Sequence, residues 1–177
     1  MRKHLVVTVT GADKPGIVEH VTRLLLAYHG NVEASKMARL GGEFAMLMML
    51  SAPEDNFDVL RDGLRQLREE GYAVTTRQTK RGYSVKYAGW LPYRLEVKGA
   101  DHEGIIHQLT GYLAKHQINI ETMDTDVVKA PMSGAPLFTM DAIIVAPPEL
   151  PYQKLKESLA TIGDELGVDT DVSPYTG

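Results

Sequence analysis

The chain has 177 residues, of which 44% are hydrophobic and 24% charged, and its formal net charge is −4. These values are ordinary for a globular protein and exclude a disordered chain, and the negative charge gives no electrostatic footprint for nucleic acid. The absence of cysteine excludes a disulfide framework, a thiolate metal site and a cysteine nucleophile.

The sequence has no segment that predicts membrane insertion or export. Its longest apolar run, Phe44–Leu50, is far shorter than a membrane span. The N-terminal residues begin with basic side chains, but the following apolar run is short and alternates with threonine, which is typical of a strand rather than a signal peptide. We therefore expect a cytoplasmic protein without membrane contact.

One stretch of the chain occurs twice. Residues 5–31 return as residues 93–119 at a fixed offset of 88, as in Gly11-Ala12-Asp13 and Gly99-Ala100-Asp101. A run of matches at one offset indicates an internal duplication. The sequence therefore predicts two domains of about 85 residues each, at residues 1–79 and 93–177, joined by a linker at residues 80–92.

The first copy begins with a strand, a turn and a helix. Leu5–Thr10 is rich in β-branched residues and predicts a strand that stops at Gly11. We expect Asp13 to cap the next helix, with Pro15 in its first turn and Gly30 in a left-handed conformation after its end. The helix is predicted by one apolar stripe, made of Ile17, Val18, Val21, Leu24, Leu25 and Tyr28.

A hairpin, a second helix and a last strand complete this copy. Gly41-Gly42 predicts a tight link between strands Val32–Leu40 and Glu43–Leu50. The second of these strands is rich in methionine and lacks clean alternation, so we expect it to be covered on both faces. The remaining elements are a helix on Phe57, Leu60, Leu64 and Leu67 that ends at Gly71, and a strand at Tyr72–Gln78.

The second copy repeats this order, with a longer hairpin loop at Lys129–Pro136 in place of Gly-Gly. Its expected strands are Tyr93–Lys98, Ile118–Val128, Leu137–Val145 and Val168–Ser173, and its helices begin near Ile105 and Tyr152. In the linker, Tyr83, Val85 and Tyr87 alternate and predict a short added strand, and Trp90 is expected to pack against both domains.

The order βαββαβ predicts an α+β protein of two ferredoxin-like domains. In each, a four-stranded antiparallel sheet carries both helices on one face. The other face of the sheet then needs cover, so we expect the two domains to pack on each other or the chain to form a homodimer.

The turn Gly11–Ile17 within this βαββαβ order closely resembles the ACT domain, a small-ligand regulatory module of amino-acid metabolism. The duplication together with Ala130–Phe138 (APMSGAPLF) resembles the group of glycine cleavage system transcriptional repressors, over nearly the whole chain. This resemblance implies a tandem ACT protein that binds an amino acid such as glycine and contacts a protein partner, a transcriptional activator, rather than DNA.

The resemblance also implies the ligand site, which in the ACT family lies between two ACT units at the first strand–helix turn. The residues implicated in the first copy are Asp13, Lys14, Pro15, Gly16 and Ile17, faced by Asn31 from the next strand. Their counterparts are Asp101, Gly104, Ile105 and Asn119. A helix N-terminus suits a carboxylate, and glycine lets a ligand approach the backbone. In the second copy His102-Glu103 replaces Lys14-Pro15, and Glu103 adds a negative charge that disfavours this site.

Simpler interpretations of these residues stay open. Gly-Ala-Asp is equally consistent with a turn that the fold needs twice, and the two asparagines with tolerance of left-handed geometry. The six histidines show no metal-binding spacing, and the methionines are typical of core filling or of an adaptable surface at Met46, Met48 and Met49. Asp124 and Asp126 are typical of a solvated face. Arg61, Arg65 and Arg68 lie close together on one predicted helix, so a basic patch for DNA stays open there.

Three classes of function remain. The first is a regulatory amino-acid sensor without cofactor or metal, and the second is a structural or protein-interaction module with no small ligand. The third, an enzyme, is disfavoured because the sequence contains no nucleophile elbow, phosphate-binding loop or metal cluster.

Overall fold

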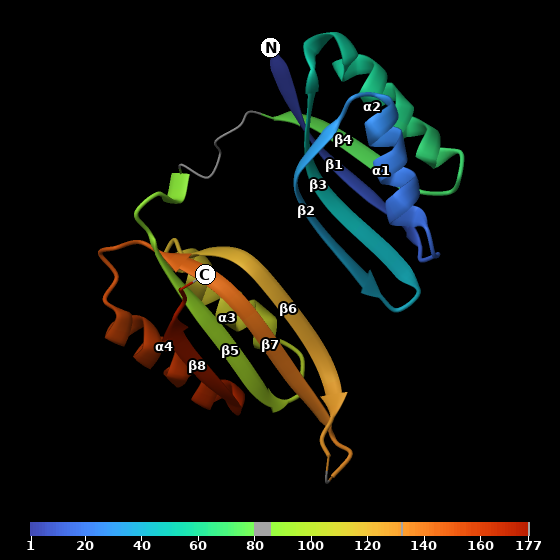
Figure 1. Cartoon of the computed structure of the whole chain (residues 1–177). Helices are drawn as coiled ribbons and strands as arrows, with labels where there is room; N and C mark the ends of the chain where they lie inside the picture. Colours follow the sequence, from blue (N-terminus) through green and yellow to red (C-terminus); the bar gives the residue numbers. More distant parts are fainter. Residues whose placement is uncertain (80–85, 132, 177) are drawn as a thin grey trace. The chain divides into compact units, whose positions relative to one another are not determined.

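The computed structural model describes residues 1–79, 86–131 and 133–176. The chain divides into two compact units, residues 1–83 and 84–177 (Figure 1). Each unit has its own sheet, its own pair of α-helices and its own hydrophobic core.

The first unit has the predicted βαββαβ order. Its elements are β1 (Arg2–Ala12), α1 (Ile17–Ala27), β2 (Asn31–Leu40), β3 (Glu43–Pro53), α2 (Phe57–Arg65) and β4 (Ala73–Thr79), with 3-10 turns at Glu54–Asn56 and Gln66–Arg68. The strands lie in the order β2-β3-β1-β4 and every pair is antiparallel. Both helices lie on the same face of the sheet (Figure 1), so the predicted fold class is confirmed.

The core of this unit forms between the helices and one face of the sheet. The alternate residues Phe44, Met46 and Met48 of β3 are buried against it, but Leu47 between them is 49% exposed. The prediction that this strand is covered on both faces is therefore wrong for the unit as described. Methionine masks the alternation in the sequence because it occupies both faces of the strand.

The ends of α1 differ from their predicted form. Gly16, with φ of 90°, is the N-cap residue, and no side chain caps the helix, so Asp13 and Pro15 lie outside it. At the other end His29, not Gly30, takes the left-handed conformation. The amide of Gly30 donates a hydrogen bond to the carbonyl of Leu25 (2.8 Å), as in a Schellman motif.

The second unit repeats this architecture. Its elements are β5 (Leu91–Ala100), α3 (Ile105–Lys115), β6 (Asn119–Lys129), β7 (Pro136–Ala146), α4 (Tyr152–Leu166) and β8 (Val168–Pro174). The antiparallel order is β6-β7-β5-β8. Leu91 and Pro92, which the sequence placed in the linker, belong to β5, and the linker residue Tyr87 lies in a short 3-10 turn. Tyr83 and Val85 of the predicted added strand fall outside the described residues.

The repeated Gly-Ala-Asp has a packing reason in both units. A Cβ on Gly11 would lie 2.7 Å from the ring of Tyr72, and one on Gly99 would lie 2.8 Å from the Cα of Val168. Both contacts are closer than real Cβ atoms allow, so only glycine fits where the last strand approaches the first.

In the described part of the chain, no helix is long and apolar enough to cross a membrane.

Candidate functional site

The turn between β1 and α1 is held by the hairpin beside it. The amide of Asp13 donates a hydrogen bond to the carbonyl of Gly42 (2.9 Å). The carboxylate of Asp13 lies 3.8 Å from the guanidinium of Arg39 on β2. Both side chains are at least one-third exposed, so this pair orients the turn rather than adding much stability.

The turn presents a cation and an uncovered stretch of backbone. The ammonium of Lys14 lies 5.1 Å from the centre of the Tyr72 ring, within cation–π range. Gly16 has nothing within 4 Å of the position that a Cβ would occupy, whereas the side chain of Ile17 is buried in the core. The start of α1 is thus anchored by Ile17 and has free space at Gly16.

The equivalent turn of the second unit borders a cavity. This cavity has a volume of about 540 Å³ and is lined by Asp101, His102, Glu103, Gly104, Ile105, Ile106, His107, Thr110 and Phe138. Gly104 has φ of 99° and is the N-cap of α3, as Gly16 is of α1. The second turn therefore keeps the backbone geometry of the first but carries two carboxylates, those of Asp101 and Glu103.

His102 joins this turn to the end of α4. Its Nδ1 lies 3.0 Å from the carbonyl oxygen of Glu103, and its Nε2 lies 2.7 Å from that of Leu166. The contact with the Glu103 carbonyl, and next that with the Leu166 carbonyl, raises the pKa of His102 above its ordinary value, and the charge of Asp101 adds to this. The imidazolium form is therefore favoured at this position.

The two asparagines do not lie at these turns. Ala12 pairs with Glu43 and Asn31 pairs with Ser51 on the same strand, β3. A separation of eight residues along a strand corresponds to about 27 Å, so Asn31 lies at the opposite end of α1 from the turn of its own unit. The strand register therefore contradicts the expectation that Asn31 faces this turn within one unit.

Asn119 has the same placement in the second unit. It pairs with Val145, whereas Ala100 at the turn pairs with Leu137. Asn119 instead lines a second cavity of about 440 Å³, together with Lys86, Tyr87, Trp90, Ala114, Gln117 and Ile118. The rings of Tyr87 and Trp90 meet edge to face at 4.8 Å. The packing of Trp90 against both domains stays a prediction.

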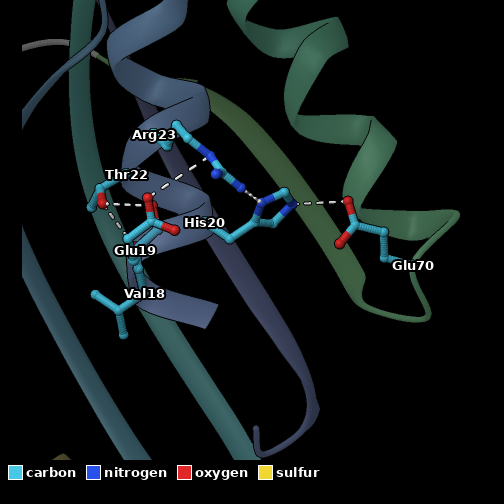
Figure 2. A network of polar contacts seen from close by, with 6 residues as sticks. All are labelled: Val18, Glu19, His20, Thr22, Arg23 and Glu70. Carbon is cyan, nitrogen blue, oxygen red and sulfur yellow. Dashed lines mark hydrogen bonds and ion pairs between the residues drawn. The ribbon is translucent and has the colours of Figure 1, made fainter. Parts of the chain in front are cut away.

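A polar network of side chains on α1 lies near the turn between β1 and α1 (Figure 2). The Nη2 of Arg23 lies 2.9 Å from Nδ1 of His20, and Nε2 of His20 lies 2.9 Å from a carboxylate oxygen of Glu70. Because arginine only donates, Nδ1 of His20 is the acceptor and Nε2 carries the proton. Glu19 approaches Arg23 from the preceding turn (3.8 Å). The network links α1 to the segment before β4.

The remaining candidate side chains have structural partners. Arg61 and Arg65 contact the carboxylates of Asp58 and Asp62, and Arg68 donates to the carbonyl of Val74, so this cluster is largely neutralised. Asp124 and Asp126 are exposed, as expected. Among the described residues no group of three or more His, Cys, Asp or Glu side chains is arranged to hold a metal ion.

Comparison with known proteins places the first unit in a family. The ACT domain model matches residues 3–76. A solved structure of an unknown protein from Galdieria sulphuraria is 32% identical and covers 99% of this chain and 100% of that chain, with a TM-score of 0.86. The first unit of the chain is therefore an ACT domain.

Two further comparisons concern this ACT-domain protein. It is 32% identical to the glycine cleavage system transcriptional repressor of Escherichia coli (strain K12) over 120 residues, which are 66% of this chain and 61% of the repressor. The match thus spans less than two thirds of the repressor's length. A solved structure of a candidate repressor of the same name is 21% identical, with a TM-score of 0.72 and coverage of 100% of this chain and 99% of that chain. At that identity it shows the shared fold alone.

Sequence reasoning missed several residues beside the ACT turns. Arg39, Tyr72 and Leu166 contact the turns from the hairpin or from the segment before the last strand, at distances along the chain that periodicity does not reveal. Thr110 and His107 lie on the same helix as Ile106, within about one helical turn of it, and line the same cavity. Their helical spacing from Ile106 could have identified them from the sequence.

Proposed function

We propose that this ACT protein is a non-catalytic regulator that binds an amino acid at its strand–helix turns and acts by contacting a protein partner. The supporting observation is the matched pair of left-handed glycines, Gly16 and Gly104, each at a helix N-cap with open space in front of it. A helix N-terminus favours an anionic group, and an amino acid carries a carboxylate.

The charges around the two turns make the first the better site for a carboxylate. The first turn carries the cation of Lys14, which lies over the Tyr72 ring, and its single carboxylate, that of Asp13, faces the cation of Arg39. The second turn combines Asp101 and Glu103 with the imidazoles of His102 and His107. The residues assigned to binding are therefore Asp13–Ile17, with Asp101, Gly104 and Ile105 as a weaker second set. Asn31 and Asn119 join a site only if another ACT unit brings them to a turn.

The name of the similar Escherichia coli protein, a glycine cleavage system transcriptional repressor, supports the more specific parts of the proposal, which are the ligand and the partner. The ligand would be glycine or a similar amino acid, and the partner a transcriptional activator of glycine cleavage genes. A homodimer in the cytoplasm, without direct DNA contact, is the form in which we expect the protein to act. Ligand binding would shift the population between two packings of ACT units, by an amount set by its difference in affinity for them.

The test is calorimetric titration of the full chain with glycine, then serine and a panel of other amino acids. We expect saturable binding close to one ligand per chain, and a loss of at least about tenfold in affinity, or about 1.4 kcal/mol, in Gly16→Leu. The leucine side chain would cover the open backbone at the start of α1. Gly104→Leu should leave this binding unchanged.

Backbone strain needs its own control, because a leucine at positive φ costs about 1–2 kcal/mol. Gly134, with φ of 70°, also has free space around it and lies in the hairpin loop outside the assigned residues. Gly134→Leu therefore imposes similar strain without covering a turn, and should bind like the wild type. Equal affinity in the wild type and Gly16→Leu would contradict the assignment of the first turn.

An interaction module without a small ligand is the alternative, and one observation favours it. Every residue of the edge strand β2 except Glu33 is exposed, with Met37 at 49% and Leu40 at 76%. A long exposed edge strand is a template for another strand, from a partner or from a second copy. The absence of binding by every amino acid tested would favour this alternative.

A further inference from the structure

Both units hold a cation at the same position of the turn, but with different chemistry. Lys14 lies over the ring of Tyr72, the residue directly before β4. His102, which is 88 positions later, contacts the carbonyl of Leu166, the last residue of α4 before β8. Each of these side chains therefore ties its turn to the part of the unit where the second helix leads into the last strand. The ordinary pKa of an imidazole lies close to neutral pH.

The two contacts of His102 together require a proton. Both ring nitrogens face carbonyl oxygens, which only accept hydrogen bonds, at 3.0 and 2.7 Å. Only the imidazolium form donates from both nitrogens. In the neutral form one nitrogen would turn its lone pair toward a carbonyl oxygen, so one of the two bonds would be lost. The Leu166 carbonyl also ends α4, where the helix dipole favours a cation.

The charged groups around His102 favour the same form. Asp101 and Glu103 flank it in the turn, and its pKa is raised first by the carbonyl of Glu103, then by that of Leu166. The end of α4 and the start of β8 add the carboxylates of Asp164, Glu165 and Asp169. The neighbouring elements also carry basic groups that would oppose the positive charge, namely Arg94 and Lys98 on β5, His107 and Lys115 on α3, and Lys154 and Lys156 on α4.

His20 in the first unit provides the contrast (Figure 2). It too links the first helix of its unit to the segment before the last strand, through Glu70. Its Nδ1 accepts a hydrogen bond from Arg23, so its contacts are complete in the neutral form. The contacts of His102 therefore need protons on both ring nitrogens, whereas those of His20 need a proton on one.

We infer that His102 is a proton-dependent latch that holds the α3 turn against the end of α4, so that pH regulates the second turn and leaves the first unaffected. A raised pKa in the folded state means that the latch stabilises the turn fully below the unfolded value of about 6.5. This stabilisation is lost as pH rises through the folded value. The part of this inference that concerns ligand binding at the second turn rests on the proposed function.

The latch is tested first without any ligand, by NMR of the full chain. At pH 6 both ring nitrogens of His102 should carry protons, and its pKa should lie above the ordinary value for histidine. Amide protection at Glu103–Ile105, corrected for intrinsic exchange, should then fall as pH rises through the pKa of His102. The amides of Lys14, Gly16 and Ile17 should show no such step in the same molecule.

Two variants complete this test. His102→Gln should show the low protection of the second turn at every pH, and Lys14→Gln should leave the pH step at the second turn intact. If His102→Gln does not fold, the wild-type titration alone still decides. A ring protonated at one nitrogen at pH 6, or identical pH profiles for His102→Gln and the wild type, would overturn the latch.

The effect on binding is measured separately, by titration of Gly16→Leu with glycine and the other amino acids at pH 6 and pH 8.5. Any binding at the second turn should weaken with rising pH, because the charge of His102 then no longer offsets Asp101 and Glu103. Addition of His102→Gln should remove this dependence. If ligand binds with equal affinity at both pH values, regulation by the latch is refuted. If no amino acid binds the wild type, the proposed function fails while the NMR result on the latch stands.

Discussion

Replacement of Leu60 by alanine is expected to unfold the first unit at temperatures where the second unit remains folded. Leu60 on α2 has no exposed surface and lies in the core of the first unit. Truncation of a fully buried leucine costs about 2–5 kcal/mol, through lost burial and the cavity left behind. A unit of this size has a total stability of about 4–12 kcal/mol, at 0.05–0.15 kcal/mol per residue, so the loss is a large fraction of it.

The measurement is thermal unfolding followed by NMR, with amide signals of the two units recorded separately. Leu155→Ala on α4 is the reciprocal variant, because Leu155 is equally buried in the core of the second unit. Leu26→Ala is the surface control, since Leu26 is 76% exposed on α1 and its removal should change stability by less than about 0.5 kcal/mol. Simultaneous loss of all signals in Leu60→Ala would contradict two independently folding domains.

The elements that depend on local patterns were predictable from the sequence. The apolar stripe of α1 and its copy in α3 repeat because each helix must bury the same face on its sheet, and Gly41-Gly42 predicted the hairpin of β2 and β3. The duplication strengthened each of these predictions, because two copies with different side chains share only what the fold requires. Gly11 and Gly99 are an example, since close approach of the last strand excludes a side chain at both positions.

The features that depend on tertiary contacts were not predictable in this way. Asp13 has a side chain suited to capping a helix, but the turn directs its carboxylate toward Arg39 and leaves the capping position to Gly16. The left-handed residue after α1 is His29, whereas a Cβ on Gly30 would lie only 3.2 Å from the side chain of Leu60. Local sequence preference identifies which residue types suit a helix cap or a left-handed position. It does not identify which of several adjacent residues takes that position.

The candidate site was predictable only in part. The turns at Gly16 and Gly104 follow from the repeated motif, and the structure gives both the same left-handed geometry. The asparagines were assigned from family resemblance, and the register of β2 on β3 places Asn31 at the far end of its unit. The role of His102 was hidden, because its second acceptor is a backbone carbonyl 64 residues away. Backbone acceptors leave no signal in a sequence.

Replacement of Gly163 by alanine is expected to destabilise the second unit, whereas the same change at Gly111 should stabilise it. Both glycines lie inside helices, where alanine is favoured by up to about 1 kcal/mol. A Cβ at Gly111 of α3 meets nothing within 4 Å, but one at Gly163 of α4 would lie 2.7 Å from the carbonyl oxygen of Val168 and 2.8 Å from Thr170. Overpacking of this kind costs about 1–3 kcal/mol.

Chemical denaturation of the two variants measures this difference directly. We expect it to be about 1–3 kcal/mol, because the gain in helix propensity is common to both variants and only Gly163→Ala is overpacked. A gain in stability for Gly163→Ala equal to that for Gly111→Ala would mean that α4 and β8 are not in close contact in solution. The same variant bears on the latch. Relief of the clash must separate the last turn of α4 from β8, and that turn carries the Leu166 carbonyl that His102 contacts. Gly163→Ala should therefore also lower the pKa of His102 toward its ordinary value, whereas Gly111→Ala should leave it unchanged.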